Sequence, residues 1–165
     1  MNIFVISLKD NNSIRKEHML NEFSKCQLNF TFFDAVIPKD INYMANKLDI
    51  NIETTSLTQG EIACLLSHLC LWDKMIKSDM DRIAIFEDDI YLSKSINSIL
   101  ENVKLNNVNF DILKLEKSLD YISVYKRNRL DLISSDKCKI YRLKSQHLGA
   151  AGYVITKKGA EKICL

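Results

Sequence analysis

Three adjacent carboxylates, Glu87, Asp88 and Asp89, directly follow an apolar run over residues 82–86. A buried strand that ends in acids would deliver them to the carboxyl edge of an α/β sheet, where such sheets bind ligands. Because side chains on an extended segment alternate faces, we expect Glu87 and Asp89 to share one side and Asp88 to turn toward the protein. Carboxylate oxygens suit a hard divalent cation, Mn²⁺ or Mg²⁺, that clamps phosphates. The plain alternative is a solvated acidic turn.

A long helix predicted over residues 61–77 carries further candidates. Its apolar positions cover more than one stripe, which indicates burial on several sides, and Thr58 with Glu61 forms a capping-box signature at its start. Glu61, His68 and Trp72 are spaced by seven and four residues, so they fall along one face and could line a cleft. The alternatives are structural: a cap for Glu61, a hydrogen-bonded core histidine for His68 and core packing for Trp72.

His147 lies at a predicted strand-to-turn boundary, just before a glycine-containing segment. An exposed histidine there is a candidate for a ligand or a general base. Gly149 and Gly152 would let the backbone approach a ligand closely, although a tight turn would use them equally well. The catalytic base is therefore left open among three candidates, Glu61, His68 and His147.

The elements that must position these residues alternate between strands and helices. Short runs of β-branched and aromatic residues predict strands, and three- and four-residue apolar spacing predicts helices. The expected strands cover residues 3–8, 29–33, 82–86, 112–115, 139–143 and 153–156, and the expected helices cover residues 14–26, 61–77 and 93–103 and begin again near residue 158. Residues 118–136 could form an irregular loop or a hairpin. The alternation predicts one α/β domain with a mostly parallel sheet flanked by helices.

Composition narrows the class of protein. The net charge of +2 over 165 residues is too mild to indicate nucleic acid, although lysines along one face could touch an anionic membrane surface. The five cysteines show no zinc-site spacing and are interpreted as reduced thiols, with Cys64 and Cys70 as small hydrophobes inside the long helix. The start of the chain lacks a signal-peptide pattern, and its apolar run is too short to span a membrane, so we expect a cytoplasmic protein.

Several blocks in this order resemble glycosyltransferase family 25, which includes bacterial enzymes of lipooligosaccharide and lipopolysaccharide biosynthesis. The blocks are Ile6–Leu8 with Arg15, Phe33–Val36, Thr58–Trp72, Phe86–Asp89 and Gly149–Ala160. The resemblance spans residues 2–165, and the block from Gly60 to Trp72 is far more specific than the acidic triplet alone.

The resemblance implies a GT-A-type, Rossmann-like fold that binds a nucleotide sugar and Mn²⁺. The family most often uses UDP-galactose and transfers the sugar with inversion to a saccharide acceptor. Carried over by position, the donor-binding residues would be Ser7, Leu8, Arg15, Asp34, Ala35, Val36, Glu61, His68, Glu87, Asp88, Gly149, Gly152 and Tyr153. The metal ligands would be Glu87 and Asp89, with His147 added from its place before Gly149. Members usually continue well beyond this last block, so a C-terminal part that would hold acceptor contacts is expected to be missing.

The leading hypothesis is a metal-assisted, inverting galactosyltransferase that uses a UDP-sugar donor and a lipooligosaccharide acceptor, with peripheral contact to the inner membrane as an open alternative. A metal-dependent nucleotidyltransferase or phosphohydrolase would also use paired acids at strand ends, but the sequence lacks a glycine-rich phosphate loop. A third hypothesis is that the protein is a catalytically inactive module that still binds a nucleotide sugar.

Overall fold

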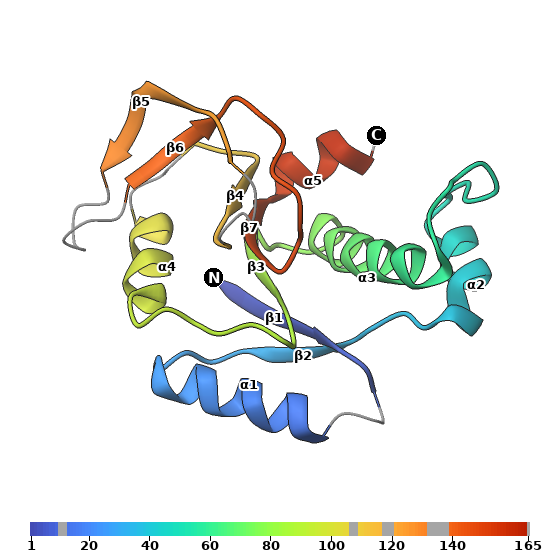
Figure 1. The fold of residues 1–165 in the computed structure, drawn as a ribbon. Coiled ribbons are helices and arrows are strands. Elements are labelled where there is room, and N and C mark those ends of the chain that lie inside the picture. The colour runs from blue at the N-terminus through green and yellow to red at the C-terminus, as the bar shows by residue number, and fades with distance from the viewer. Residues whose placement is uncertain (10–12, 106–108, 117–120, 132–138, 165) are drawn as a thin grey trace.

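A five-stranded sheet forms the centre of the protein, with the strand order β2-β1-β3-β7-β4 (Figure 1). Its strands are β1 (Asn2–Ser7), β2 (Thr31–Asp34), β3 (Arg82–Glu87), β4 (Ile112–Lys114) and β7 (Gly152–Thr156). The computed structural model describes residues 1–9, 13–105, 109–116, 121–131 and 139–164. The α/β architecture with helices flanking the sheet is thus confirmed.

The direction of β7 differs from the expected parallel arrangement. β1 pairs in parallel with both β2 and β3, but β7 runs antiparallel to β3 and to β4, so the sheet is mixed. Parallel neighbours require a crossover, usually a helix. The strands that precede β7 in the chain are β5 (Val124–Asp131) and β6 (Lys139–Leu143), which pair with each other as a separate antiparallel hairpin. The described residues between β4 and β7 therefore contain no helical crossover. The hairpin alternative is confirmed for β5 as one arm, while its other arm, β6, begins beyond residue 136, and residues 118–120 and 132–136 lie outside the described part of the chain.

Helices cover both faces of the sheet. α1 (Ser13–Lys25) and α4 (Ile96–Leu105) pack on one face, while α3 (Gln59–Ile76) and α5 (Lys157–Cys164) pack on the other (Figure 1). Alternate residues of each strand enter the two cores: Val5 and Phe86 join α1 and α4, whereas Ile6 and Ile85 join α3. This two-residue alternation is the pattern of strands buried on both sides.

A short 3₁₀ turn (Pro38–Asp40) and α2 (Ile41–Lys47) follow β2 and pack against the beginning of α3.

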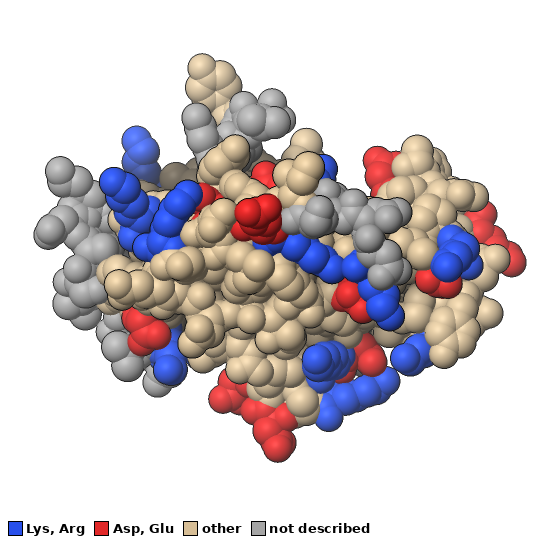
Figure 2. Space-filling model, turned by 90° about the horizontal axis from the view of Figure 1, so that it is seen from below, with Lys and Arg blue, Asp and Glu red and all other residues tan. Residues whose placement is uncertain are grey.

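None of the described helices combines the length and the apolar character that a membrane-spanning helix needs. Where the described residues face the viewer in Figure 2, basic and acidic side chains are interspersed. Four cysteines, Cys26, Cys64, Cys70 and Cys164, are free thiols, and Cys138 lies outside the described residues.

Close packing of α5 on the segment before β4 gives a test of this arrangement. A Cβ atom at Gly159 would lie 2.4 Å from the carbonyl oxygen of Asp111, whereas one at Gly60 in α3 would meet nothing within 4 Å. We expect Gly159→Ala to lower the free energy of unfolding by about 1 to 3 kcal/mol. Gly60→Ala should leave it unchanged or raise it by up to about 1 kcal/mol, because alanine is the better helix former. Urea denaturation followed by circular dichroism measures both, and equal stabilities would contradict the packing.

Candidate active site

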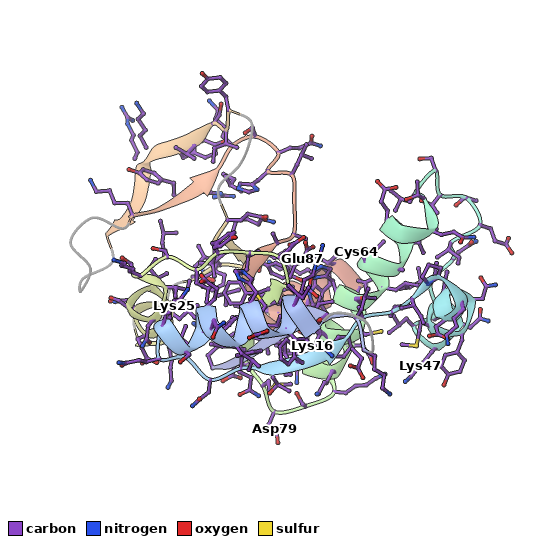
Figure 3. The ribbon with its side chains drawn as sticks, turned by 60° about the horizontal axis from the view of Figure 1, so that its bottom comes forward. Lys16, Lys25, Lys47, Cys64, Asp79 and Glu87 are labelled. Atoms are coloured by element: carbon purple, nitrogen blue, oxygen red, sulfur yellow. The ribbon has the colours of Figure 1, made fainter. Side chains whose placement is uncertain are left out.

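The carboxyl ends of β1, β2 and β3 meet at one edge of the sheet. Ile6 lies opposite Glu87 in the β1–β3 register, and Ser7 lies opposite Asp34 in the β1–β2 register. β1 lies between the other two strands. The chain places β2 on one side of β1 and then β3 on the other side, so the direction in which strands are added to the sheet reverses between β1 and β3. Open α/β sheets bind ligands in the crevice at such a switch point. The acidic triplet therefore lies where the topology favours a ligand, while Asp79, at the other end of β3, lies far from it (Figure 3).

The three acids of the triplet have different surroundings. Glu87 faces α3, where its Oε1 lies 3.6 Å from His68 Nε2 and 3.8 Å from Cys64 Sγ. Asp88 is buried and accepts a hydrogen bond of 2.9 Å from Arg15 on α1, as expected for the acid turned toward the protein. Asp89 is exposed, and its Oδ2 lies 3.5 Å from the same guanidinium nitrogen. Glu87 and Asp89 thus lie against different helices, because the chain leaves the extended conformation after Glu87.

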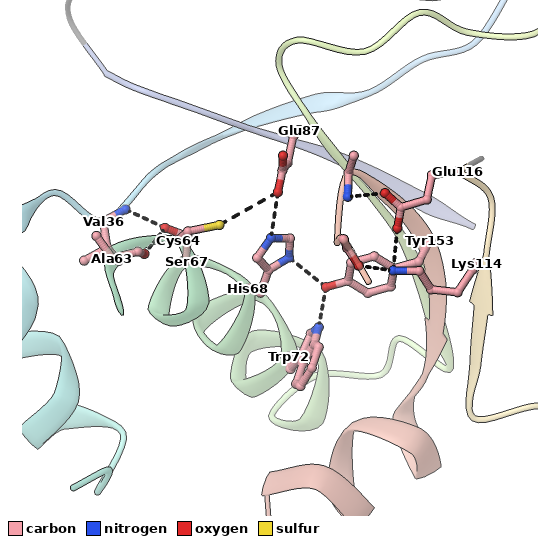
Figure 4. Close-up of polar contacts among 12 residues, drawn as sticks. Val36, Ala63, Cys64, Ser67, His68, Trp72, Glu87, Lys114, Glu116 and Tyr153 are labelled. Atoms are coloured by element: carbon pink, nitrogen blue, oxygen red, sulfur yellow. Dashed lines mark hydrogen bonds and ion pairs between the residues drawn. The ribbon is translucent and has the colours of Figure 1, made fainter. Parts of the chain in front are cut away.

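A buried network joins α3 to β7 behind Glu87 (Figure 4). Trp72 Nε1 donates to Tyr153 Oη at 2.9 Å, and His68 Nδ1 lies 2.8 Å from the same oxygen. An indole N–H can only donate, so the tyrosine oxygen accepts there and its own proton is free to be donated to His68. That arrangement leaves the ring proton of a neutral His68 on Nε2, facing Glu87.

The electrostatic state of the site follows from these contacts. The nearby His68 imidazole lowers the pKa of Glu87 more than its partial burial raises it, so the carboxylate is charged at neutral pH. Burial, reinforced by Glu87, raises the pKa of the Cys64 thiol, and burial also raises the pKa of Tyr153. On the other side of the strand, Asp88 raises the pKa of Arg15. The edge thus carries one carboxylate beside an imidazole and a thiol and two beside a guanidinium.

The segment after β2 is held against this edge. Ala35 N donates to the carbonyl of Ser7 at 2.9 Å, and Val36 N donates to Ser67 Oγ on α3 at 2.8 Å. The hydroxyl oxygen of Ser7 is buried and has no hydrogen-bond partner in the described part of the chain. Leu8, the next residue, is exposed. The structure therefore brings Ser7, Leu8 and the residues from Asp34 to Val36 together, as the resemblance implied.

The segment before β7 also reaches the acidic end of β3. Glu87 N donates to the carbonyl of Ala151 at 3.0 Å, and Ala151 N donates to Glu116 Oε2 at 3.0 Å. Gly149 has a φ of 92°, in the left-handed region that favours glycine. Lys114 donates to its carbonyl oxygen and pairs with Glu116. Sequence reasoning missed Lys114 and Glu116, because neither belongs to a motif and only the pairing of β4 with β7 places them here.

Cys64 also differs from its expected role as a buried hydrophobe. It is exposed on α3 and turns its thiol toward Glu87. Its position four residues before His68 places both side chains on one helix face, and this spacing was the signal that could have found it. Among the described residues, Cys64, His68 and Glu87 form the one group of three whose potential metal-ligand atoms gather, all within 4.8 Å of one another.

Two candidate residues lie apart from this group. Glu61 is held in the predicted capping box: its Oε2 accepts from Thr58 N at 2.8 Å, and its own N donates to Thr58 Oγ1 at 3.3 Å. His147 lines a groove of about 880 Å³ between β4 and the β5–β6 hairpin, with its Nδ1 3.0 Å from the carbonyl of Leu148. The structure does not bring either one together with Glu87 and Asp89, so their catalytic and metal roles stay predictions.

Comparison with known proteins decides the family. A model of glycosyltransferase family 25, described as a lipopolysaccharide biosynthesis protein, matches residues 1–165. The chain belongs to glycosyltransferase family 25.

Curated relatives of this family-25 chain include proteins of Haemophilus influenzae and Neisseria meningitidis. The lipooligosaccharide biosynthesis protein lic2B of Haemophilus influenzae is 35% identical over 155 residues, which cover 90% of this chain and 57% of that protein. The lipooligosaccharide biosynthesis protein lex-1 of the same species is 29% identical over 188 residues, covering 96% of this chain and 61% of the relative. The lacto-N-neotetraose biosynthesis glycosyltransferase LgtE of Neisseria meningitidis is 30% identical over 152 residues, which cover 87% of this chain and 53% of that protein. The family-25 chain thus spans little more than half the length of these relatives.

The Trp72–Tyr153–His68 network predicts a measurable stability effect. In Tyr153→Phe the buried N–H of Trp72 and Nδ1 of His68 both lose their partner, and each unsatisfied group costs about 1 to 3 kcal/mol. We expect this variant to unfold at lower urea concentration than the native protein, with a loss of at least about 1 kcal/mol. Tyr43→Phe, at an exposed tyrosine on α2, is the matched control and should change nothing.

A double-mutant cycle with Trp72→Phe separates the hydrogen bond from general loss of packing. The combined variant should lose less stability than the sum of the two single variants, by at least about 0.5 kcal/mol. Strict additivity, or a Tyr153→Phe variant as stable as the native protein, would show that the tyrosine hydroxyl does not connect the two helix side chains.

Proposed function

We propose that this family-25 protein is a glycosyltransferase of lipooligosaccharide biosynthesis, which moves a sugar from a nucleotide-sugar donor to a saccharide acceptor. The observation that carries the proposal is the family match over all 165 residues. The names of lic2B, lex-1 and LgtE, which describe lipooligosaccharide and lacto-N-neotetraose biosynthesis, support the acceptor class. UDP-galactose is the proposed donor, by the family resemblance, and inversion is the proposed outcome.

The mixed sheet with helices on both faces is compatible with the GT-A-type fold that we propose. The donor would lie along the edge where β1, β2 and β3 end, against Ser7, Leu8 and the residues from Asp34 to Val36. A buried hydroxyl without a partner at Ser7 supports a ligand there, since buried polar atoms are normally paired. Gly149 and Gly152 carry no side chain, so the backbone before β7 could come close to the donor. This backbone would line the end of the crevice that holds the sugar of the donor.

A divalent cation, Mn²⁺ or Mg²⁺, could be bound by Asp89, the exposed acid of the triplet. Asp89 offers an exposed carboxylate, and such ions are often held by one or two carboxylates together with substrate phosphates. When bound, the ion would neutralise the donor diphosphate and stabilise the charge that develops on it as the leaving group. The Arg15 side chain is about half exposed, and its guanidinium, which lies beside Asp88 and Asp89, could also attract the diphosphate.

Glu87 has a different proposed task. Its carboxylate is charged and partly exposed, so it can accept a hydrogen bond from a sugar hydroxyl of the donor. His68 is an unfavourable general base in this arrangement, because it is buried and Tyr153 occupies its Nδ1. We therefore propose that His68 orients Glu87 and leave the group that deprotonates the acceptor unassigned.

Binding of UDP with and without Mn²⁺ tests the proposal. Isothermal titration should show UDP binding that strengthens when Mn²⁺ is present. Asp89→Ala should weaken the Mn²⁺-dependent component by at least about 10-fold, since even indirect supports of a metal contribute that much. Asp79→Ala, at an exposed acid on the opposite end of β3, is the control and should bind as the native protein does. Failure of the native protein to bind UDP would contradict the proposal.

A screen for slow donor hydrolysis across nucleotide sugars in Mn²⁺ then identifies the sugar. Release of UDP fastest from UDP-galactose is the expected result. Metal-dependent UDP binding without hydrolysis or transfer of any donor would instead support an inactive module that only binds the nucleotide sugar.

A further inference from the structure

The space between α3 and the end of β3 holds three ligand atoms of different chemistry. Cys64 Sγ, His68 Nε2 and a carboxylate oxygen of Glu87 all lie within 4.8 Å of one another (Figure 4). In Figure 3 the labelled Cys64 and Glu87 lie next to each other near the middle of the view, consistent with their contact. The first two side chains are four residues apart on one helix face, and the third comes from the neighbouring strand, so the group joins two rigid elements.

His68 gives independent evidence that something belongs in this space. The residue is only 4% exposed, yet its Nε2 has no hydrogen-bond partner in the described part of the chain. The nearest acceptor, Glu87 Oε1, is 3.6 Å away, which is beyond ordinary hydrogen-bond distance. A buried polar atom without a partner costs about 1 to 3 kcal/mol, so a ligand that reaches Nε2 would recover that cost.

Two of the three separations are close to the edges of a tetrahedral metal site, and the third is within 4.8 Å. With metal–ligand bonds of about 2.0 to 2.3 Å, two ligand atoms of a tetrahedral Zn²⁺ site lie about 3.3 to 3.6 Å apart. The observed values are 3.6 Å from His68 Nε2 to Glu87 Oε1 and 3.8 Å from Cys64 Sγ to the same oxygen. Small rotations of the exposed Cys64 side chain and of Glu87 would therefore bring the three atoms around one ion.

The ligand types select the metal. Thiolate and imidazole favour Zn²⁺ and similar thiophilic ions, whereas Mg²⁺ and Mn²⁺ prefer oxygen ligands. We propose that Cys64, His68 and Glu87 form a binding site for Zn²⁺ or a similar thiophilic divalent cation, distinct from the hard-cation position at Asp89. Three protein ligands leave the fourth position of a tetrahedral ion open, on the exposed side where Cys64 lies.

The surrounding residues support His68 as a ligand. Binding at Nε2 displaces the proton there, so the neutral ring carries its proton on Nδ1 instead. That proton can be donated to Tyr153 Oη, which has two lone pairs and accepts one N–H from Trp72 already. Metal-bound histidines normally donate their second ring N–H to such a partner, which fixes the orientation of the ring. Cys64 binds as thiolate and releases its proton to solvent.

Occupancy of this site would have a consequence at the sheet edge. An ion bound there holds one oxygen of the Glu87 carboxylate against α3, so only the other oxygen is left to accept a hydrogen bond from a donor sugar. The metal site itself does not depend on sugar transfer, and its test needs neither a donor nor an acceptor.

Cobalt absorption tests the site on the whole chain. Co²⁺ reports thiolate coordination by a sulfur-to-metal charge-transfer band and tetrahedral geometry by intense visible bands. The native protein, reduced and freed of metal, should develop both at about one equivalent, and Zn²⁺ should abolish them. Cys64→Ser should lose the charge-transfer band and bind Zn²⁺ at least 10-fold more weakly in competition with a chromophoric chelator. Because Cys64 is exposed, this variant should fold normally, as circular dichroism will check.

Cys70→Ser is the matched control, since Cys70 lies on the same helix but outside the group. It should keep the cobalt spectrum and the Zn²⁺ affinity of the native protein. Glu87→Gln should keep the charge-transfer band but bind more weakly. Absence of a thiolate band in the native protein, or its full retention in Cys64→Ser, would overturn the proposal, because the ion would then be bound elsewhere or not at all.

Discussion

Backbone pairing between β1 and β3 fixes which residues meet at the functional edge of the sheet. Its register places Ile6 opposite Glu87, and the alternation of side chains then sends Phe86 to the α1 face and Ile85 to the α3 face. Both neighbours are almost fully buried on opposite faces of the sheet, so a shift by one residue would exchange the side chains that the two cores receive. The direction in which Glu87 points is therefore a consequence of core packing and not of local preference.

Two environments result at the end of this one strand. Toward α3, Glu87 contacts the imidazole of His68 and the thiol of Cys64. Behind them, Tyr153 is buried and hydrogen-bonded to His68 and to Trp72. Toward α1, Asp88 and Asp89 meet the guanidinium of Arg15. The first environment suits a soft cation or a sugar hydroxyl, and the second suits a diphosphate with its hard counter-ion. Adjacent acids can thus take different tasks because the strand separates two helical layers.

Much of the architecture could be predicted from the sequence because its causes are local. The capping box at Thr58 and Glu61 needs only four consecutive residues, and the buried strands need only short apolar runs. The family motifs likewise identified the chain, a result that the family match confirmed. The sheet was predicted to be mostly parallel, but it is mixed, because β7 runs antiparallel to β3 and β4 and the described residues before it form the hairpin of β5 and β6.

The sequence by itself determined the helix–strand order, the acids at the end of β3 and the family. Only the tertiary structure decided how those acids divide between neighbours, that Cys64 faces Glu87, and that Lys114 and Glu116 hold the backbone before β7. The contacts of Cys64 with Glu87, of Glu116 with Ala151 and of Arg15 with Asp88 join residues that lie 23, 35 and 73 positions apart in the chain. Side-chain chemistry can be read from single residues, but proximity across such separations depends on strand register and helix packing, which no short motif encodes.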